Sequence, residues 1–313
     1  MTHRNLIFAS ALSIAFIAIG TPSASAQYVF RSIDLPGGAA TYIGDNNNHG
    51  AIPGCYQVGS FSAGRRGFSL SHGVFQPVNY PGATDTCPEG VSNNGTVVGH
   101  YVDKSGNEHG FLFAAGKYTS FDYPGAISTL GFGLSNAGMV IGEYWDGSAL
   151  HSFKLKGGTF TNIDPPGAAG SVAEAINDAG QIVGAYSLTD KQLENAAQGY
   201  VLSGGSYTTI DYPSATNTFC GGINNSGDYA GWYSDSSGVY HGFTDISGTF
   251  ASVDYPGAAD TFAFQINGAG QIDGIWNGAV SVGYDIHGFL ATPLNGLKVP
   301  GPESRDRRPS AHR

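Results

Sequence analysis

One motif recurs six times along this chain, at intervals of 42 to 47 residues. It centres on an aspartate in the pattern Ile-Asp-x-Pro-Gly-Ala, as at Asp164, with valine in place of isoleucine at Asp254. The six motif positions are Asp34, Asn79, Asp122, Asp164, Asp211 and Asp254. A fixed period of this length indicates stacked copies of one supersecondary unit, none of which can bury a core alone.

Other residue types keep a constant distance from the motif aspartate. Glycines lie 16 and 20 residues after it. Seven residues after it there is always a hydroxyl, at Thr41, Thr86, Thr129, Ser171, Thr218 and Thr261. Twenty-two residues after it there is always an aromatic ring, at Tyr56, Tyr101, Tyr144, Tyr186, Tyr233 and Trp276. The repeats therefore share one internal structure.

Each repeat predicts four short strands. The first is exemplified by Thr218 to Asn224, and a tight Asn/Ser/Gly turn follows it. The second is exemplified by Gln181 to Tyr186, and the third carries His-Gly-Phe or a variant of it. The fourth ends at the next motif aspartate. Four strands at this period are typical of a propeller blade.

The two ends of residues 27–294 complement each other. Tyr28 to Asp34 is a fourth strand without its three predecessors, and the last copy ends after its third strand at Thr292. We therefore predict an all-β fold, a six-bladed β-propeller closed by the N-terminal strand completing the last blade. A parallel β-helix is the alternative, but its rungs do not need three hairpin turns per repeat.

The segments outside 27–294 have a different composition. Residues 1–26 contain a basic start, an apolar stretch from Leu6 to Ile19 and an Ala-Ser-Ala cleavage site, which predicts a cleaved signal peptide. The apolar stretch is too short for a comfortable membrane span. We therefore expect a secreted or periplasmic monomer without a membrane span after cleavage. The Pro-rich, charged residues 295–313 predict a disordered tail.

Charge limits the partners of the propeller. Residues 27–294 hold 8 basic and 22 acidic residues, a net charge of −14. Nucleic-acid binding requires a basic footprint, and anionic membranes attract basic segments. The sequence therefore argues against both.

Three cysteines leave two interpretations open. Cys55 and Cys87 lie in successive repeats, so they can form a bridge between adjacent blades, with Cys220 left over. Alternatively, all three are small buried thiols at apolar positions.

The repeat also resembles a known family. The blocks Gly180–Tyr186, His241–Phe243 and Phe160–Ala168 are similar to the extracellular repeats named HAF, over nearly the whole of 27–294. The resemblance implies a secreted, repeat-built bacterial protein and brings no catalytic residues. Family members frequently carry a C-terminal sorting segment that begins Val-Pro-Glu-Pro and continues into an apolar helix. Here Val299–Pro302 reads Val-Pro-Gly-Pro without that helix, so surface anchoring does not follow.

The repeating Asp and His are expected to be structural. The motif aspartate is expected to accept backbone N–H groups in its own turn. A calcium loop fits poorly, since the best match, Asp45–Gly50, has His49 at a ligand position. The third-strand histidines are too far apart to share a metal, and each is expected to be buried against a neighbouring turn. We therefore expect neither a metal nor a cofactor.

Variable loops indicate where a ligand binds. Only the loop between the second and third strands changes length, at 57–65, 102–108, 145–150, 187–197, 234–240 and 277–286. These loops emerge on the same face as the connections between blades, and such loops build binding surfaces. Aromatic rings beside a carboxylate suit a glycan or an extracellular protein. The predicted ligand-binding residues are His100, Glu143, Trp145, Trp232, Tyr123 and Tyr212. The alternative is that the Trp and Tyr rings cap contacts between blades.

A second hypothesis is catalytic. Ten residues after the motif aspartate the chain has Gly44, Glu89, Phe132, Glu174, Gly221 and Phe264, so Glu89 and Glu174 lie on innermost strands. Paired carboxyls can perform acid–base or glycosidic chemistry. Asp273 also interrupts a mostly apolar column. No catalytic fingerprint accompanies these residues, so we favour a non-catalytic binding protein. A passive structural role in the matrix or envelope is the third hypothesis.

Overall fold

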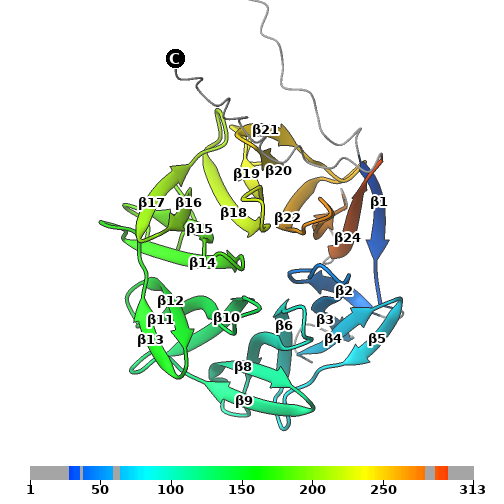
Figure 1. Ribbon diagram of the computed structural model, residues 1–313, viewed down its shortest axis with the longest axis vertical. Coiled ribbons are helices and arrows are strands. Elements are labelled where there is room, and N and C mark those ends of the chain that lie inside the picture. Colours follow the sequence, from blue (N-terminus) through cyan, green and yellow to red (C-terminus); the bar gives the residue numbers. More distant parts are fainter. Residues whose placement is uncertain (1–27, 36–37, 59–63, 279–285, 295–313) are drawn as a thin grey trace, which may run out of the picture.

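The computed structural model describes residues 28–35, 38–58, 64–278 and 286–294. Six antiparallel four-stranded sheets surround one axis, as Figure 1 shows. The predicted six-bladed β-propeller is confirmed, and the β-helix is excluded. The predicted signal peptide and tail lie outside the described residues.

Blades 1 to 5 each contain four consecutive strands, paired in chain order from the innermost strand outward. Blade 1 contains β2 (Gly38–Ile43), β3 (Ile52–Val58), β4 (Arg65–Ser71) and β5 (Val74–Pro77). Blade 2 contains β6 (Asp85–Val91), β7 (Val97–Val102), β8 (Glu108–Ala114) and β9 (Lys117–Phe121). Blade 3 contains β10 (Ser128–Leu134), β11 (Val140–Trp145), β12 (Leu150–Lys156) and β13 (Thr159–Asn162). Blade 4 contains β14 (Gly170–Ile176), β15 (Ile182–Ser187), β16 (Gln198–Ser203) and β17 (Ser206–Ile210). Blade 5 contains β18 (Asn217–Ile223), β19 (Tyr229–Ser234), β20 (Tyr240–Ile246) and β21 (Thr249–Ser252).

Blade 6 closes the ring as predicted. It contains β22 (Asp260–Ile266), β23 (Ile272–Asn277), β24 (Ile286–Pro293) and, as its outermost strand, β1 (Tyr28–Ile33). β1 pairs antiparallel with β24, with Ser32 opposite Phe289. Strands from the two ends of the described chain thus share one sheet, and the ladder hydrogen bonds hold the ring closed.

The innermost strands of blades 2 to 6 carry a β-bulge. In blade 3 the register with β11 shifts between Gly131 and Gly133, so Phe132 is the extra residue. The same shift occurs around Glu89, Glu174, Gly221 and Phe264. A bulge bends the strand and re-aims its side chain. The bulge residue is the one ten positions after the motif aspartate.

This bulge explains the glycine 20 residues after the motif aspartate. A Cβ added at Gly142 would lie 2.0 Å from the carbonyl oxygen of Leu130, and one at Gly274 would lie 1.9 Å from that of Phe262. No side chain fits so close to a facing backbone. The glycine 16 residues after the motif has another cause, since Gly227 has φ 84° in its tight turn.

The core consists of several separate clusters within and between the blades. The third-strand aromatic residue is fully buried in every blade, at Phe68, Phe111, Phe153, Tyr200, Phe243 and Phe289. Burial of one such ring contributes about 1.5–3 kcal/mol. Each blade therefore depends on its neighbour for stability.

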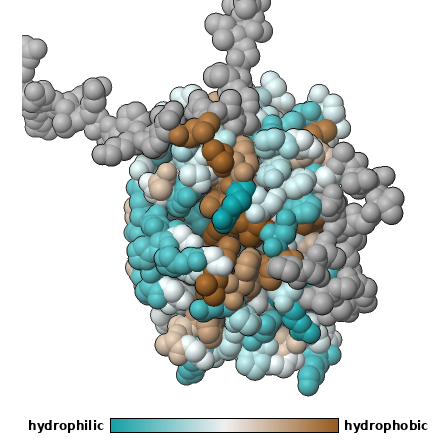
Figure 2. Space-filling model, turned by 90° about the vertical axis from the view of Figure 1, so that its right-hand side faces the viewer, coloured by the Kyte–Doolittle hydropathy of each residue, from teal (hydrophilic) through white to brown (hydrophobic). Residues whose placement is uncertain are grey.

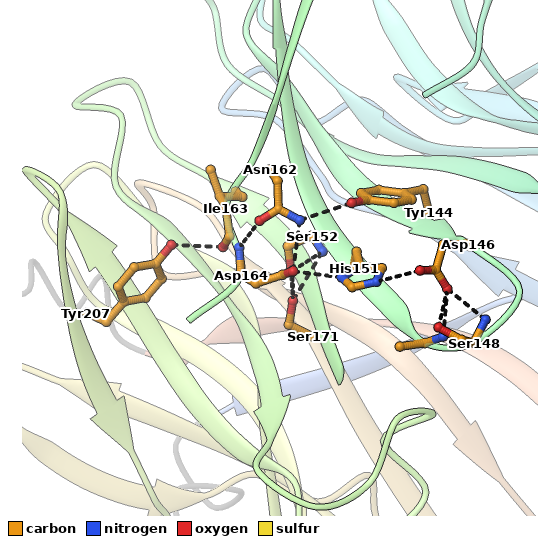
Figure 3. Close-up of polar contacts among 11 residues, drawn as sticks. Tyr144, Asp146, Ser148, His151, Ser152, Asn162, Ile163, Asp164, Ser171 and Tyr207 are labelled. Carbon is orange, nitrogen blue, oxygen red and sulfur yellow. Dashed lines mark hydrogen bonds and ion pairs between the residues drawn. The ribbon is translucent and has the colours of Figure 1, made fainter. Parts of the chain in front are cut away.

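The motif aspartate binds the third strand rather than its own turn, which corrects our expectation. In blade 3, Asp164 accepts the backbone N–H of Ser152 at 2.8 Å and contacts His151 Nδ1 at 2.7 Å, as Figure 3 shows. The hydroxyl seven residues on holds the connection instead, since Thr129 Oγ1 accepts the N–H of Tyr123. Pro165 has no N–H, and there Ser171 donates to Asp164.

The third-strand histidines are not buried against a turn, which is a second correction. The side chain of His151 is 25% exposed, and its ring stacks on Tyr144 with centroids 4.9 Å apart. The same histidine–aromatic–aspartate arrangement occurs at His109, His241 and His287. These histidines hold the third and fourth strands of a blade together.

A disulfide links blades 1 and 2. Cys55 of β3 bonds Cys87 of β6, with 4.9 Å between the Cα atoms, and Cys220 is a buried free thiol. The bridge interpretation is therefore correct. A loop of this length contributes about 3–4 kcal/mol by constraining the unfolded chain.

The outer side of the ring is partly apolar. Figure 2 shows the side that carries β1 and β5 in Figure 1, with apolar and hydrophilic residues intermingled. Val29 of β1 and Val74 and Phe75 of β5 are exposed there. No helix of the described ranges has the length and hydropathy needed to cross a bilayer.

Candidate functional site

A cavity of about 210 Å³ lies at the propeller axis. Its lining consists of the six residues ten positions after the motif aspartate together with two others: Gly44, Glu89, Phe132, Glu174, Gly221, Phe264, Asp45 and Trp232. Five of these side chains or glycines occupy the bulges, so the bulges aim them at the axis. The bulge residue lies nearer the tight-turn end of its strand, as Glu89 does in β6, and Asp45 lines both this cavity and a depression among the tight turns.

The structure brings together residues that belong to two different sequence hypotheses. Glu89 and Glu174, the catalytic candidates, line the same cavity as Trp232, a predicted ligand-binding residue. Trp232 stacks on Phe219 with parallel rings 5.1 Å apart and meets Phe264 edge-on at 5.5 Å. Trp232 of blade 5 and Phe264 of blade 6 therefore form an aromatic wall, and Glu89 and Glu174 reach the cavity from blades 2 and 4.

The cavity carboxyls titrate far above their ordinary range. Burial raises the pKa of Glu89 to about 8, although Arg65 opposes this effect. Burial, then the charges of Glu143 and Glu89, raise the pKa of Glu174 to about 8. Burial also raises the pKa of Asp45, as do the charges of Asp273 and Glu174. At neutral pH these groups bind protons that they would release in water.

His100 lies behind Glu89. Its side chain is 6% exposed, Nδ1 is 3.5 Å from the Glu89 carboxylate, and Nε2 is 3.1 Å from Arg65 Nη2. Arg65 in turn forms charge-assisted hydrogen bonds to both carboxylate oxygens of Asp85. Burial, then the charge of Arg65, lower the pKa of His100 to about 3, so the imidazole is neutral.

A metal is poorly matched by this cluster. Cys87, Glu89 and His100 form one group of ligand atoms within 4.8 Å of one another among the described residues. Cys87 is in the disulfide and offers no thiolate, which is the form that binds metals.

The remaining predicted ligand-binding residues lie elsewhere. The charge of Glu143 acts on Glu174. Burial, and then the charge of Glu108, raise the pKa of Glu143 to about 7. Trp145 ends β11, where its carbonyl accepts the N–H of Ile127, and it does not line the axial cavity.

Tyr123 and Tyr212 lie in connections between blades. Tyr123 stacks on Tyr144 with ring centroids 3.7 Å apart, and Tyr212 stacks on Tyr233 at 3.8 Å. Each ring therefore packs against the blade that follows it. Each also lines a pocket beside the motif aspartate at the seam before its blade, of about 400 Å³ for Tyr123 and about 540 Å³ for Tyr212. These pockets are separate from the axial cavity.

Three contributors to the site were not predicted from the sequence. Asp45 follows the column of bulge residues by one position, and Phe132 and Phe264 belong to that column but were not selected. Their periodic position was the signal that could have identified them. The sequence did not indicate that Arg65 would contact His100, because that contact crosses from blade 1 to blade 2.

The opposite face carries a shallow depression lined by tight turns. Around it, the residue 14 positions after the motif aspartate accepts a backbone N–H from the neighbouring blade. The N–H of Asn48 donates to the side chain of Asn93, and the N–H of Asn93 donates to that of Asn136. The N–H of Asn136 donates to the side chain of Asp178, and the N–H of Asp178 donates to that of Asn225. Gly268 donates to Asn48. The sixth link, from Asn225 to Gly268, has no side-chain acceptor.

Asp273 connects two blades and does not line the axial cavity. It is fully buried, and its Oδ2 accepts the backbone N–H of Asn46 in blade 1 at 2.9 Å. The other blades have Pro53, Val98, Ile141, Val183 and Ala230 at this position. Asp273 therefore joins blade 6 to blade 1.

Comparison with solved structures supports the architecture. The SapL1 lectin in complex with alpha methyl fucoside is 11% identical over 83% of this chain and 93% of that chain, with a TM-score of 0.50. TolB from Acinetobacter baumannii is 12% identical over 88% and 66%, also with 0.50. A lectin from Aleuria aurantia, described as a six-bladed β-propeller with a fucose recognition mode, is 11% identical over 87% and 98%, with 0.47. The six four-stranded sheets around one axis make the chain a six-bladed β-propeller.

At these identities the likeness shows the fold alone. No protein-family model matches the chain, and no curated protein matches it in sequence. The resemblance to HAF repeats therefore stays a prediction.

Proposed function

We propose that this chain is a secreted, non-catalytic glycan-binding protein whose site is the axial cavity. One observation carries the proposal: the rings of Phe132, Trp232 and Phe264 share a cavity with the carboxyls of Glu89 and Glu174. Aromatic rings pack against the C–H faces of sugars, and carboxyls bind their hydroxyls. The cavity is smaller than the roughly 300 Å³ of pockets for drug-sized ligands, which suits a single sugar ring.

Two further observations support the proposal. The SapL1 structure was solved with a fucoside, so a related architecture serves as a lectin in that protein. The disulfide between Cys55 and Cys87 is typical of oxidising compartments, in agreement with the predicted signal peptide.

The test is glycan-array binding by the mature protein and by two tryptophan variants. Trp232→Ala is expected to weaken binding at least about tenfold, or about 1.4 kcal/mol. Trp145→Ala, a tryptophan outside the cavity lining, is the matched control and is expected to bind normally. Unfolding midpoints show whether each variant is folded, and Glu174→Gln provides a second cavity variant. Loss of binding in Trp145→Ala alone, or no binding by the wild type, would contradict the proposal.

A hydrolase is the second candidate function. The raised pKa of Glu89 and of Glu174 is typical of a general acid that must be protonated at neutral pH. The same array reports hydrolysis, and turnover lost in Glu89→Gln and Glu174→Gln would replace the binding proposal with this one.

A further inference from the structure

The axial cavity has an unbalanced charge. Asp45, Glu89 and Glu174 contribute carboxyl groups to its lining, whereas no lysine or arginine lines it. Burying ionised carboxyls without partners is unfavourable, and the raised pKa values express that cost. A neutral sugar would leave the imbalance unchanged, and an acidic sugar would increase it.

The neighbours of Glu89 do not neutralise it. Arg65, on β4, is the nearest cation, but its guanidinium is bonded to Asp85 on β6. His100, on β7, is neutral, and its buried Nδ1 has no hydrogen-bond partner within the described structure. Nδ1 faces the Glu89 carboxylate at 3.5 Å, too far for a good hydrogen bond.

The neighbours of Glu174 and Asp45 are mostly acidic too. The charges acting on Glu174 come from Glu143 on β11 and Glu89 on β6. Those acting on Asp45 come from Asp273 on β23, Glu174 on β14 and Glu89, and Gln265 on β22 supplies a hydrogen bond. Among the described residues, no hydrogen bond or ion pair reaches the Glu174 carboxyl.

Buried polar atoms without well-aligned hydrogen bonds also lie where blade 1 meets blade 6. Asn46 is 6% exposed and lines the depression on the opposite face together with Asp45 and Gln265. Neither its amide nitrogen nor its amide oxygen has a well-aligned hydrogen bond in the described structure, and neither does Oδ1 of Asp273. The Asn46 side chain nevertheless acts on Asp273, since a hydrogen bond from it opposes the effect of burial on the pKa of Asp273. These atoms belong to the contact between blades 6 and 1 and do not line the axial cavity.

The aromatic wall suits a cation as well as a sugar. Trp232 and Phe264 line the cavity from neighbouring blades with their ring centroids 5.5 Å apart, and Phe132 lines it from blade 3. Ring faces attract ammonium groups electrostatically, and Trp attracts them most strongly. Carboxyls and rings that share the cavity therefore match a ligand with a positive group on an apolar frame.

We propose that the axial cavity selects amino sugars, that is, glycans whose sugar residue carries a free protonated amine. This inference rests on the proposed glycan-binding function and specifies its ligand class. The ammonium group binds between Glu89 and Glu174, and the C–H face of the sugar packs on Trp232. Acetylation of the amine removes the charge, so N-acetylated sugars bind less tightly.

The experiment compares four soluble probes by isothermal titration calorimetry at pH 7: the β-1,4 tetramers of glucosamine, N-acetylglucosamine and glucose, and tetralysine. We expect the glucosamine tetramer to bind at least tenfold more tightly than the other three. Because the ammonium favours ionised carboxyls, binding should lower their pKa and release protons. Titration in buffers of different ionisation enthalpy measures that release.

Two variants separate the cavity from general charge attraction. Glu174→Gln keeps the shape and hydrogen-bonding capacity of the side chain, and it is expected to remove the preference for the free amine. Glu194→Gln, which removes an exposed charge in the variable loop of blade 4, is expected to retain it.

Each other outcome is decisive. Equal affinity for the free and the acetylated tetramers overturns the inference and leaves the proposed function standing. Tetralysine binding as tightly as the glucosamine tetramer assigns the cavity to a cationic peptide and overturns the amino-sugar assignment. An equal loss of preference in both variants shows a long-range charge effect instead of a site. No binding of any glycan overturns both proposals.

Discussion

At the scale of single residues, the repeating positions act as partners of one another. Where the third strand has histidine, the residue after the preceding motif aspartate is tyrosine, and the two rings enclose the second-strand aromatic. Blades 1 and 4 have Arg66 and Gln198 in place of histidine, and Leu35 and Pro165 in place of tyrosine. The substitutions occur together because each ring needs the next one to pack against.

We predict that His151→Ala destabilises the protein by about 1–2 kcal/mol. The change removes the stack on Tyr144 and the contacts to Asp164 and Asp146, which lie at 2.7 Å and 3.3 Å. Urea unfolding measures the loss. Gln198→Ala in blade 4 is the control, since Gln198 makes one side-chain contact, to Asp211 at 3.3 Å. Equal losses in the two variants would show that the stack contributes nothing.

At the scale of the blade, one bulge and one tight turn determine what each face presents. The bulge in the innermost strand directs a side chain to the axis and requires a glycine opposite it. The tight turn places a carbonyl-bearing side chain where the neighbouring blade donates an N–H. Five of the six seams have this link, and the seam from blade 5 to blade 6 lacks it because residue 268 is glycine.

We therefore predict that Gly268→Asn stabilises the protein by about 0.5–1.5 kcal/mol, because it supplies the missing acceptor for the N–H of Asn225. A Cβ at Gly268 would meet only the Asn48 side chain, at 3.0 Å, and φ there is not in the left-handed region. Gly268→Ala is the control, since it restricts the unfolded chain without adding the link. A Gly268→Asn variant no more stable than Gly268→Ala in urea would contradict the prediction.

At the scale of the whole molecule, ring closure concentrates acidic groups at the axis. Six strands converge there, and three of them bring carboxyls from different blades into one cavity. The disulfide and the β1–β24 pairing hold the ring closed around them. The proposed ligand specificity and the predicted pH dependence of stability thus rest on the same carboxyls.

We predict that the free energy of unfolding falls as the pH rises from 6.5 to 8. The pKa of Glu89 and of Glu174 is about 8 in the fold and about 4.3 in the unfolded chain, so the folded state binds more protons in this range. The slope is at most about 1.4 kcal/mol per pH unit for each carboxyl. The lowered pKa of His100, about 3, acts in the opposite direction but only below about pH 6.5.

Urea titrations at pH 6.5, 7.2 and 8 measure this slope. The double variant Glu89→Gln, Glu174→Gln is expected to reduce it, because amides do not titrate, and to leave the contribution of Glu143, whose pKa is about 7. A wild-type stability that rises with pH over this range would contradict the burial of these carboxyls.

The sequence by itself determined the propeller, its six blades and its closure, since a repeat with fixed internal spacing leaves each unit dependent on its neighbour. It also placed Glu89 and Glu174 on innermost strands, because side-chain position follows from the period. Only the tertiary structure decided that Trp232 shares their cavity, that Cys55 bonds Cys87, and that the motif aspartate binds histidine instead of its own turn. These contacts depend on distances across strands and between blades, which a linear pattern does not contain.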